Sequence, residues 1–427
     1  MKWALTIVAG VGLVTLAGCE TPPTYRALMQ DILLEADYWE DEPRILAVGL
    51  GFTDVNGTPG VSLPLDLAEF AVLINGGAWN TIHADVDPDD VPLRAYTSAI
   101  SPIGMWLSFG VPSFYGDGTP MELSWPVLPS TVHPEDILIT LNTGEQVQPV
   151  NISIMPNFEY NERSTLVMNG DFGNRIDPDE PGAVYPVLFE IVDDGTPMML
   201  LGPGGRIESA VGLNYGDGTT PLTAYGEGNG PRLCAAKLTH MADGLLGEGG
   251  PAFFSGSLPN DGVTLYGADA QYRLRVLTTG GFSPDGVRSL YPTEFSSFFR
   301  IKVCLSPAHG EVIWLEETGV PYAIGDLGTI EILGLADLGP RWDVYDDIYI
   351  EDHDNQIDII LKGDAAAMRC IRAVHIPASG DYLAFYNPGG PGNNPFPAVT
   401  YTSAGPEWLQ PVTIALDDPM QVSHLPK

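Results

Sequence analysis

Short apolar runs separated by turn-forming residues dominate the chain from residue 44 onwards. Runs of roughly five to eight residues alternate with clusters of Gly, Pro, Asn and Asp. This spacing is typical of a β-sandwich or barrel, because each run suits one strand and each cluster suits a turn. The pattern therefore predicts an all-β protein with two β-sandwich or barrel-like domains and a few short helices.

The predicted strands fall into two groups, on either side of a Gly-rich stretch at residues 202–205. The first group comprises 45–52, 69–74, 105–109, 136–141, 150–155 and 164–168. The second comprises 232–238, 272–278, 299–305, 311–316, 329–333, 347–350, 356–361 and 374–376. Helices are predicted at 293–299 and, after an Asp364 N-cap, at 365–371. We expect a first β domain at 44–201, which resembles a bacterial immunoglobulin-like sandwich, and a second β-rich domain at 206–427.

An Asx-Gly-Thr motif occurs four times between residues 56 and 221. The copies begin at Asn56, Asp117, Asp194 and Asp217; a proline follows the first three directly and the fourth after one further threonine. The unequal spacing excludes a solenoid repeat. Since Asn-Gly and Asp-Gly supply the positive φ that tight turns need, we predict a turn at each copy.

The amino terminus contains the most specific motif in the sequence. Lys2 precedes an uncharged apolar stretch that ends in Leu16-Ala17-Gly18-Cys19, and this stretch is shorter than the ~20 residues of a spanning helix. These four residues resemble the lipobox of bacterial lipoproteins. The resemblance implies a signal peptide at 1–18 and a diacylated Cys19 that anchors the mature chain in a membrane, since each buried CH₂ contributes ~0.8 kcal/mol. The alternative is an ordinary signal peptide with a coincidental cysteine.

Further expectations follow from this resemblance. Glu20 stands where an Asp would favour inner-membrane retention, so a lipid-anchored place in the bacterial cell envelope, at the outer membrane, is favoured. Residues 19–43 end in several acidic side chains and are expected to form an acidic tether.

Composition narrows the class of partner. The 427 residues include 19 basic and 55 acidic side chains, which gives a formal net charge of −36. That balance excludes a basic nucleic-acid binder and suits the surface of an exported protein. The membrane, through the lipid anchor, is the one partner that the sequence predicts.

Two acidic segments suggest calcium, which takes six to eight oxygen ligands from carboxylates, amides and carbonyls. The candidate ligands are Asp352, Asp354, Asn355 and Asp358 at a predicted hairpin tip, and Asp85, Asp87 and Asp89 in a proline-bounded loop. An EF-hand is excluded, because Ile357 stands where that loop needs glycine. The alternative is that these residues form solvated turns, where Asp and Asn are common.

The scarce basic residues are a second kind of candidate. Arg273 and Arg275 alternate on one face of a predicted strand, and further cations lie between 232 and 288. Two alternatives are open. In so acidic a chain we expect internal ion pairs with nearby Asp and Glu, and the other alternative is an anion-binding pocket, because an Arg fork matches a carboxylate or phosphate.

No complete catalytic motif is present. The sequence contains neither Gly-x-Ser-x-Gly nor His-Glu-x-x-His. We therefore expect a lipid-anchored binding or structural protein stabilised by calcium. The alternative is an exported hydrolase acting on polysaccharide or ester, with its site in the second domain near His240, Asp243, the two arginines and the 387–397 loop. Besides Cys19, the odd set Cys234, Cys304 and Cys370 allows one disulfide at most, and buried free thiols are favoured.

Overall fold

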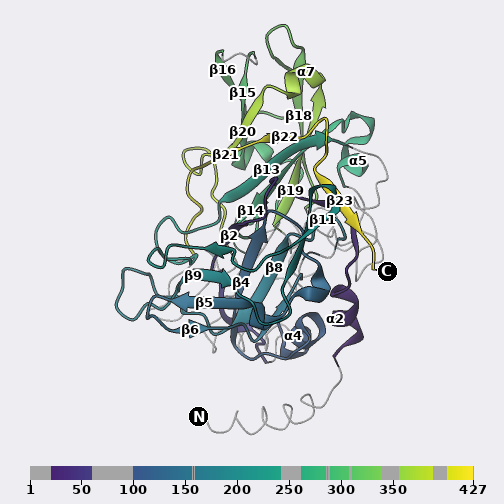
Figure 1. Cartoon of the computed structure of the whole chain (residues 1–427). Coiled ribbons are helices and arrows are strands. Elements are labelled where there is room, and N and C mark those ends of the chain that lie inside the picture. Colours follow the sequence, from purple (N-terminus) through teal and green to yellow (C-terminus); the bar gives the residue numbers. More distant parts are fainter. Residues whose placement is uncertain are drawn as a thin grey trace, which may run out of the picture.

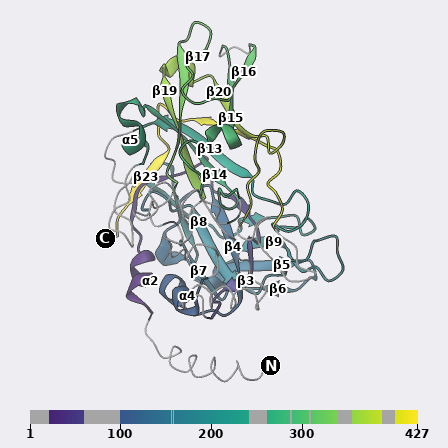
Figure 2. The ribbon, with the colours of Figure 1, turned by 180° about the vertical axis from the view of Figure 1, so that it is seen from behind.

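The computed structural model describes residues 21–59, 100–155, 157, 159–241, 261–284, 286, 289–306, 310–338, 355–387 and 402–426. Strands predominate in these residues, the sheets are almost wholly antiparallel, and the helices are short. The predicted all-β class with sandwich-like domains is confirmed. Figure 1 shows two groups of strands, one above the other, and Figure 2 shows the same arrangement from behind.

The first unit contains the strands from β2 to β12 and is built around one apolar core. Its sheets have the orders β2-β4-β8-β7 with β3 also on β4, β12-β9-β5-β6, and β10-β11. Its strands are β2 (Ile45–Val48), β3 (Phe52–Asn56), β4 (Gly116–Leu123), β5 (Ile137–Leu141), β6 (Gln146–Val147), β7 (Asn151–Ser153), β8 (Thr165–Gly170), β9 (Pro186–Ile191), β10 (Met199–Gly202), β11 (Arg206–Ser209) and β12 (Asn214–Tyr215). The short helices are α4 (Pro102–Phe109), η1 (Pro129–Thr131), η2 (Pro134–Asp136) and η3 (Pro203–Gly205). The core includes Trp125, Phe172 and Phe189, all fully buried.

The second unit contains the strands from β13 to β22. Its sheets have the orders β17-β18-β19-β14-β13-β22 and β16-β15-β20-β21. The strands are β13 (Leu233–His240), β14 (Tyr272–Thr278), β15 (Arg300–Cys304), β16 (Val312–Leu315), β17 (Tyr322–Ala323), β18 (Thr329–Ala336), β19 (Gln356–Gly363), β20 (Ile371–Ile376), β21 (Trp408–Pro411) and β22 (Thr413–Ile414). The helices are α5 (Asp261–Tyr266), η4 (Gly267–Asp269), α6 (Phe295–Phe298) and α7 (Ala365–Met368). A cluster of phenylalanines, with the Phe298 and Phe385 rings 4.7 Å apart, fills the core between the two sheets.

The two ends of the described chain meet. Helix α2 (Pro23–Leu28) leads to β1 (Leu33–Asp37), which pairs antiparallel with β23 (Gln421–His424). The sequence analysis assigned residues 19–43 to a tether, whereas Leu33, Asp37 and Trp39 are buried here. The acidic residues suggested solvent, but Asp37 has cationic partners in the second unit. Across the described residues, no helix is both long enough and apolar enough to span a membrane.

One predicted strand is a helix. Residues 105–109 belong to α4, where the apolar run alone predicted a strand. The Ser101 hydroxyl accepts a hydrogen bond from the Gly104 amide at 3.1 Å, and Gly110 ends the helix in the left-handed region with φ 78°. These start and stop signals lie beside the apolar run rather than in it, and they determine the local structure.

The four Asx-Gly-Thr copies do not all form turns. Asp194 and Asp217 each accept the backbone N–H two residues later, at 2.6 and 2.7 Å, in exposed turns. Asn56 ends β3 before a glycine with φ 81°. Asp117 is instead buried inside β4, where it accepts the Phe172 amide at 2.6 Å. The predicted turn at this copy is wrong, because the paired strands on both sides continue the ladder through it.

Candidate functional site

The junction between the two units carries a row of charged side chains. Strand β14 is buried along its whole length, yet it alternates apolar residues with Arg273 and Arg275. Since successive side chains of a strand point to opposite faces, Leu274 and Val276 enter the core of the second unit and the arginines face the first unit. In register with Arg275 lie Lys237 on β13 and Asp358 on β19, so one row crosses three strands.

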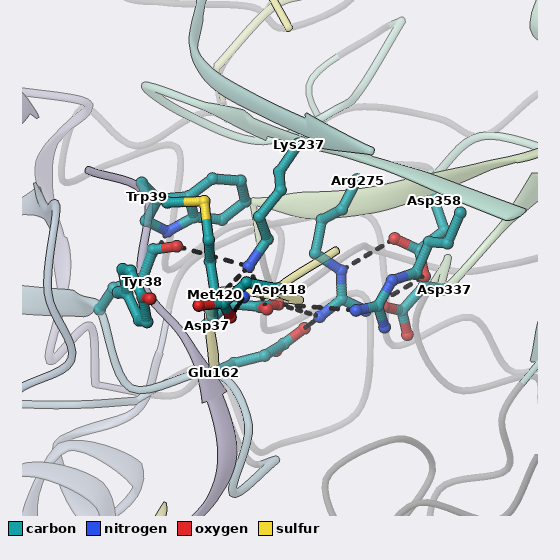
Figure 3. A network of polar contacts seen from close by, with 12 residues as sticks. Asp37, Tyr38, Trp39, Glu162, Lys237, Arg275, Asp337, Asp358, Asp418 and Met420 are labelled. Carbon is teal, nitrogen blue, oxygen red and sulfur yellow. Dashed lines mark hydrogen bonds and ion pairs between the residues drawn. The ribbon is translucent and has the colours of Figure 1, made fainter. Parts of the chain in front are cut away.

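Asp37 of β1 enters this row (Figure 3). Its carboxylate accepts a hydrogen bond from Lys237 Nζ at 2.5 Å and another from Arg275 Nη1 at 3.0 Å. Lys237 also donates to the Met420 carbonyl at 3.0 Å and lies 5.4 Å from the centre of the Trp39 ring. The amino-terminal strand, the carboxyl-terminal segment and the second unit therefore meet at one ammonium group.

Arg275 is the centre of the network. It binds Asp358 through two hydrogen bonds, from Nε at 2.8 Å and from Nη2 at 3.1 Å, and it also donates to Asp337. Arg273 extends the row, with Nε 3.8 Å from Asp358 and Nη2 4.0 Å from Asp37. Charged groups buried this deeply need partners of this geometry, because burial removes their hydration.

The electrostatics of the junction follow from burial and pairing. Burial alone would raise the pKa of Asp37, but the charges of Lys237, Arg273 and Arg275 hold that pKa well below its usual range. Burial lowers the pKa of Lys237 to about 8, and the bond to Asp37 offsets part of that effect. Although burial opposes its charge, Arg275 keeps a pKa well above its usual value because Asp358, Asp337 and Asp37 surround it. At neutral pH these groups are ionised.

Three carboxylates gather beside the network. Glu159 and Glu162 of the first unit and Asp337 of the second each place an oxygen within 4.8 Å of the others. Burial raises the pKa of Glu162 to about 8 and that of Asp337 to about 6. Oxygen atoms at such separations suit a hard cation.

A second polar contact joins the units near Asn355. Its amide donates to the Thr278 carbonyl at 2.8 Å in the second unit, and its oxygen accepts a 3.3 Å hydrogen bond from Thr165 in the first. Thr165 also donates to Glu122 at 2.6 Å. Asn355 is thus a bridge between the units.

The structure brings together four of the predicted site residues. Asn355, Asp358, Arg273 and Arg275 all lie at the junction. Asp358 is paired with Arg275, which is the internal ion-pair alternative of the sequence analysis. The other predicted site residues lie outside the described residues: Cys19, Asp85, Asp87, Asp89, Asp352 and Asp354.

Sequence reasoning missed the carboxylates that complete the network. Asp37 stood in the expected tether, and Glu159, Glu162 and Asp337 belong to no motif. The one available signal was the alternation of charged with apolar residues in strand 272–278, which requires a buried counter-charge on the facing surface. That signal predicts that the buried arginines need carboxylate partners, but it does not predict where in the sequence those partners lie.

The cysteines form no disulfide in the described structure: Cys234, Cys304 and Cys370 are free. Cys304 and Cys370 are buried, and burial raises the pKa of Cys370 and, more strongly, that of Cys234. Comparison with known proteins adds no family, since no family model, curated protein or solved structure matches this chain.

Proposed function

We propose that this protein is a lipid-anchored, extracytoplasmic β-sandwich protein with a binding or structural role. The observation that carries the proposal is that several of its few basic side chains are buried and paired. Lys237, Arg273 and Arg275 are buried and face carboxylates of the same chain, so they join two units instead of awaiting a substrate. The lipobox-like motif at Cys19 supplies the proposed anchor.

The junction suits a protein that must hold its surface at a fixed orientation. Bidentate pairing between Arg275 and Asp358 tolerates little movement, because both hydrogen bonds depend on the plane of the guanidinium group. The β1–β23 pair and Asn355 add further contacts between segments far apart in the sequence. We propose that the two units work as one body on a single anchor, at the outer membrane of a bacterial cell envelope.

The hydrolase alternative needs an accessible site in the second unit. Of its predicted residues, Arg273 and Arg275 are buried, and His240 is exposed at the end of β13 with its ring 5.0 Å from that of Tyr272. Asp243 lies outside the described residues. These placements favour the binding or structural role over a reaction at this cluster.

The proposed function includes calcium binding by the acidic segments. Asp85, Asp87 and Asp89, and likewise Asp352 and Asp354, place several carboxylates within a few residues of one another. A cation that binds only the folded state raises the melting temperature. We expect the full chain to melt higher in millimolar calcium than in chelator, and equal melting temperatures would count against calcium.

The anchor is tested by cell fractionation. The full chain should sediment with membranes and stay there after a high-salt wash, while Cys19→Ser should be released. A Cys234→Ser variant is the matched control and should stay with the membranes. Membrane retention of Cys19→Ser would refute the lipid anchor.

A further inference from the structure

The described residues of the loop at 157–163, which are 157 and 159–163, are mostly buried although most of them are polar. Asn157 is 0% exposed, Asn161 and Glu162 are each 1% exposed, and Glu159 is 7% exposed. Connecting segments normally run over the surface, because a buried loop carries polar groups that need partners. This loop therefore requires an explanation for its side chains.

The backbone of the loop is accounted for. The Leu34 amide of β1 donates to the Tyr160 carbonyl at 3.0 Å, and the Asp37 amide donates to the Asn161 carbonyl at 3.1 Å. Arg163 donates to the Asn157 carbonyl at 2.8 Å. These bonds fix the loop against β1 and beside the charged network.

Three polar side chains of the same loop, those of Asn157, Asn161 and Glu162, are not accounted for. Among the described residues, neither carboxylate oxygen of Glu162 accepts a hydrogen bond, and both amide atoms of Asn157 and of Asn161 also have no hydrogen-bond partner. Arg275 lies beside Glu162, with Nη1 3.9 Å from Oε1, which is beyond hydrogen-bond length. Arg275 already donates to Asp37, Asp337 and Asp358. Buried polar atoms without a hydrogen-bond partner can be satisfied by a bound ion or an ordered water.

Around Glu162, three carboxylate groups bring oxygen atoms close together. Glu159, Glu162 and Asp337 converge to within 4.8 Å, and calcium holds its oxygens at about 2.3–2.6 Å, so opposite ligands are about 5 Å apart. Asp337 has φ 60°, a left-handed conformation that non-glycine residues seldom adopt and that is frequent at functional sites. These three groups are all carboxylates, with no nitrogen or sulfur donor among them, which favours calcium or magnesium over zinc.

We propose that Glu159, Glu162 and Asp337 bind one calcium ion, which links the two units at their junction. Glu159 and Glu162 come from the first unit and Asp337 from the second. Calcium fits better than magnesium, because its coordination is flexible and magnesium keeps a near-ideal octahedron with several waters. The inference deepens the calcium part of the proposed function, but it names different residues and rests on the buried loop.

The test uses the full chain purified in mild detergent and stripped with EDTA. Melting temperature and calorimetric titration are followed with calcium chloride, and in parallel with magnesium chloride. Glu162→Gln keeps the size of the side chain and removes one carboxylate, so it should fold and melt in EDTA at least as high as the wild type. Glu145→Gln, an exposed carboxylate in the β5–β6 turn, is the matched control.

The expected result is a calcium-dependent rise in melting temperature for the wild type and for Glu145→Gln. Glu162→Gln should bind calcium roughly tenfold or more weakly, since changes even outside the first ligand sphere cost 10–100-fold. Asp337→Asn should lose the response in the same way.

Three outcomes would overturn the inference. If the melting temperature of the wild type does not respond to calcium, the site is refuted and calcium is removed from the proposed function as well. The three carboxylates would then be held together by a shared proton alone. An unchanged response of Glu162→Gln, with loss of the response on neutralising Asp85, Asp87 and Asp89 or Asp352 and Asp354, would leave that function intact and refute this site alone. A response to magnesium but not calcium would refute the choice of ion.

Discussion

Replacing Arg275 by methionine removes the centre of the junction and keeps most of the apolar stem. Four hydrogen bonds to carboxylates are lost: two to Asp358, one to Asp37 and one to Asp337. Asp37 keeps Lys237 at 2.5 Å, whereas the Arg273 Nε beside Asp358 is 3.8 Å away.

The expected cost follows from those losses. Hydrogen bonds to charged groups contribute roughly 1.5–3 kcal/mol each, so the gross loss is large. Part of it is recovered because Arg275 no longer has to be dehydrated, and breaking a buried pair from one side costs about 3–5 kcal/mol in practice. We expect Arg275→Met to lower the free energy of unfolding by about 4 kcal/mol, a large share of the roughly 5–15 kcal/mol typical of folded proteins.

The chain offers a matched control in Arg369. It also binds one carboxylate, that of Asp417, through two hydrogen bonds of 2.7 and 3.0 Å, from Nη2 and Nη1, but at the surface. Urea unfolding, followed by tryptophan fluorescence, should place Arg369→Met close to the wild type, because water screens an exposed pair.

A second substitution distinguishes the cost of an unpaired buried carboxylate from the cost of poor packing around the new methionine. In the Arg275→Met background, Asp358→Asn removes a carboxylate that has lost its partner, so it should restore at least about 1 kcal/mol of stability. The reasoning is refuted if Arg275→Met costs no more than Arg369→Met, or if Asp358→Asn makes the Arg275→Met protein less stable.

Three further predictions concern burial elsewhere. Burial raises the pKa of Glu122 to about 8, so the folded state binds an extra proton between the unfolded pKa near 4.5 and about 8, and the free energy of unfolding falls as pH rises through that window. In urea unfolding, Glu122→Gln should remove up to roughly 3 kcal/mol of the loss between pH 5.5 and pH 8. Equal pH slopes for the variant and the wild type would contradict this. A Cβ at Gly202 would lie 2.3 Å from the buried indole of Trp125, so Gly202→Ala should cost about 1–3 kcal/mol and shift the fluorescence spectrum, whereas a neutral effect would show that the indole can move. Cys304 and Cys370, which are buried, should resist a thiol reagent in the native protein, and these two and Cys234 should all react after unfolding in urea without reductant; fewer than three reactive thiols would indicate a disulfide.

The strand pattern could be predicted because it depends on local alternation. The expected strand 272–278 matches β14, and 356–361 lies within β19. The helix at 102–109 was missed because its capping residues lie outside the apolar run that was used to predict a strand. Local sequence thus gave the class of element where the apolar run and its flanks agreed.

The junction could be predicted only in part. Arg273 and Arg275 stood out as charges in an apolar strand, and ion pairing was one of the two interpretations. Their partner Asp37 is more than two hundred residues away in the sequence, on a strand that pairs with the other end of the chain. Such a contact depends on the packing of whole units, and no local pattern specifies it.

The charged junction favours one arrangement of the two units over others. Its apolar contact is small, with Trp39 and Leu46 of the amino-terminal half packed on Ala235 and Leu277 of the second unit. Apolar contact alone is non-directional and would allow the surfaces to slide. Each buried charge, by contrast, is costly unless its own partner is in place. Asp37 lies on β1, which pairs with β23, and Lys237 donates both to Asp37 and to the Met420 carbonyl next to β23. The first described strand and the last strand therefore contact the same buried ammonium group, and we expect the two strands to dock together.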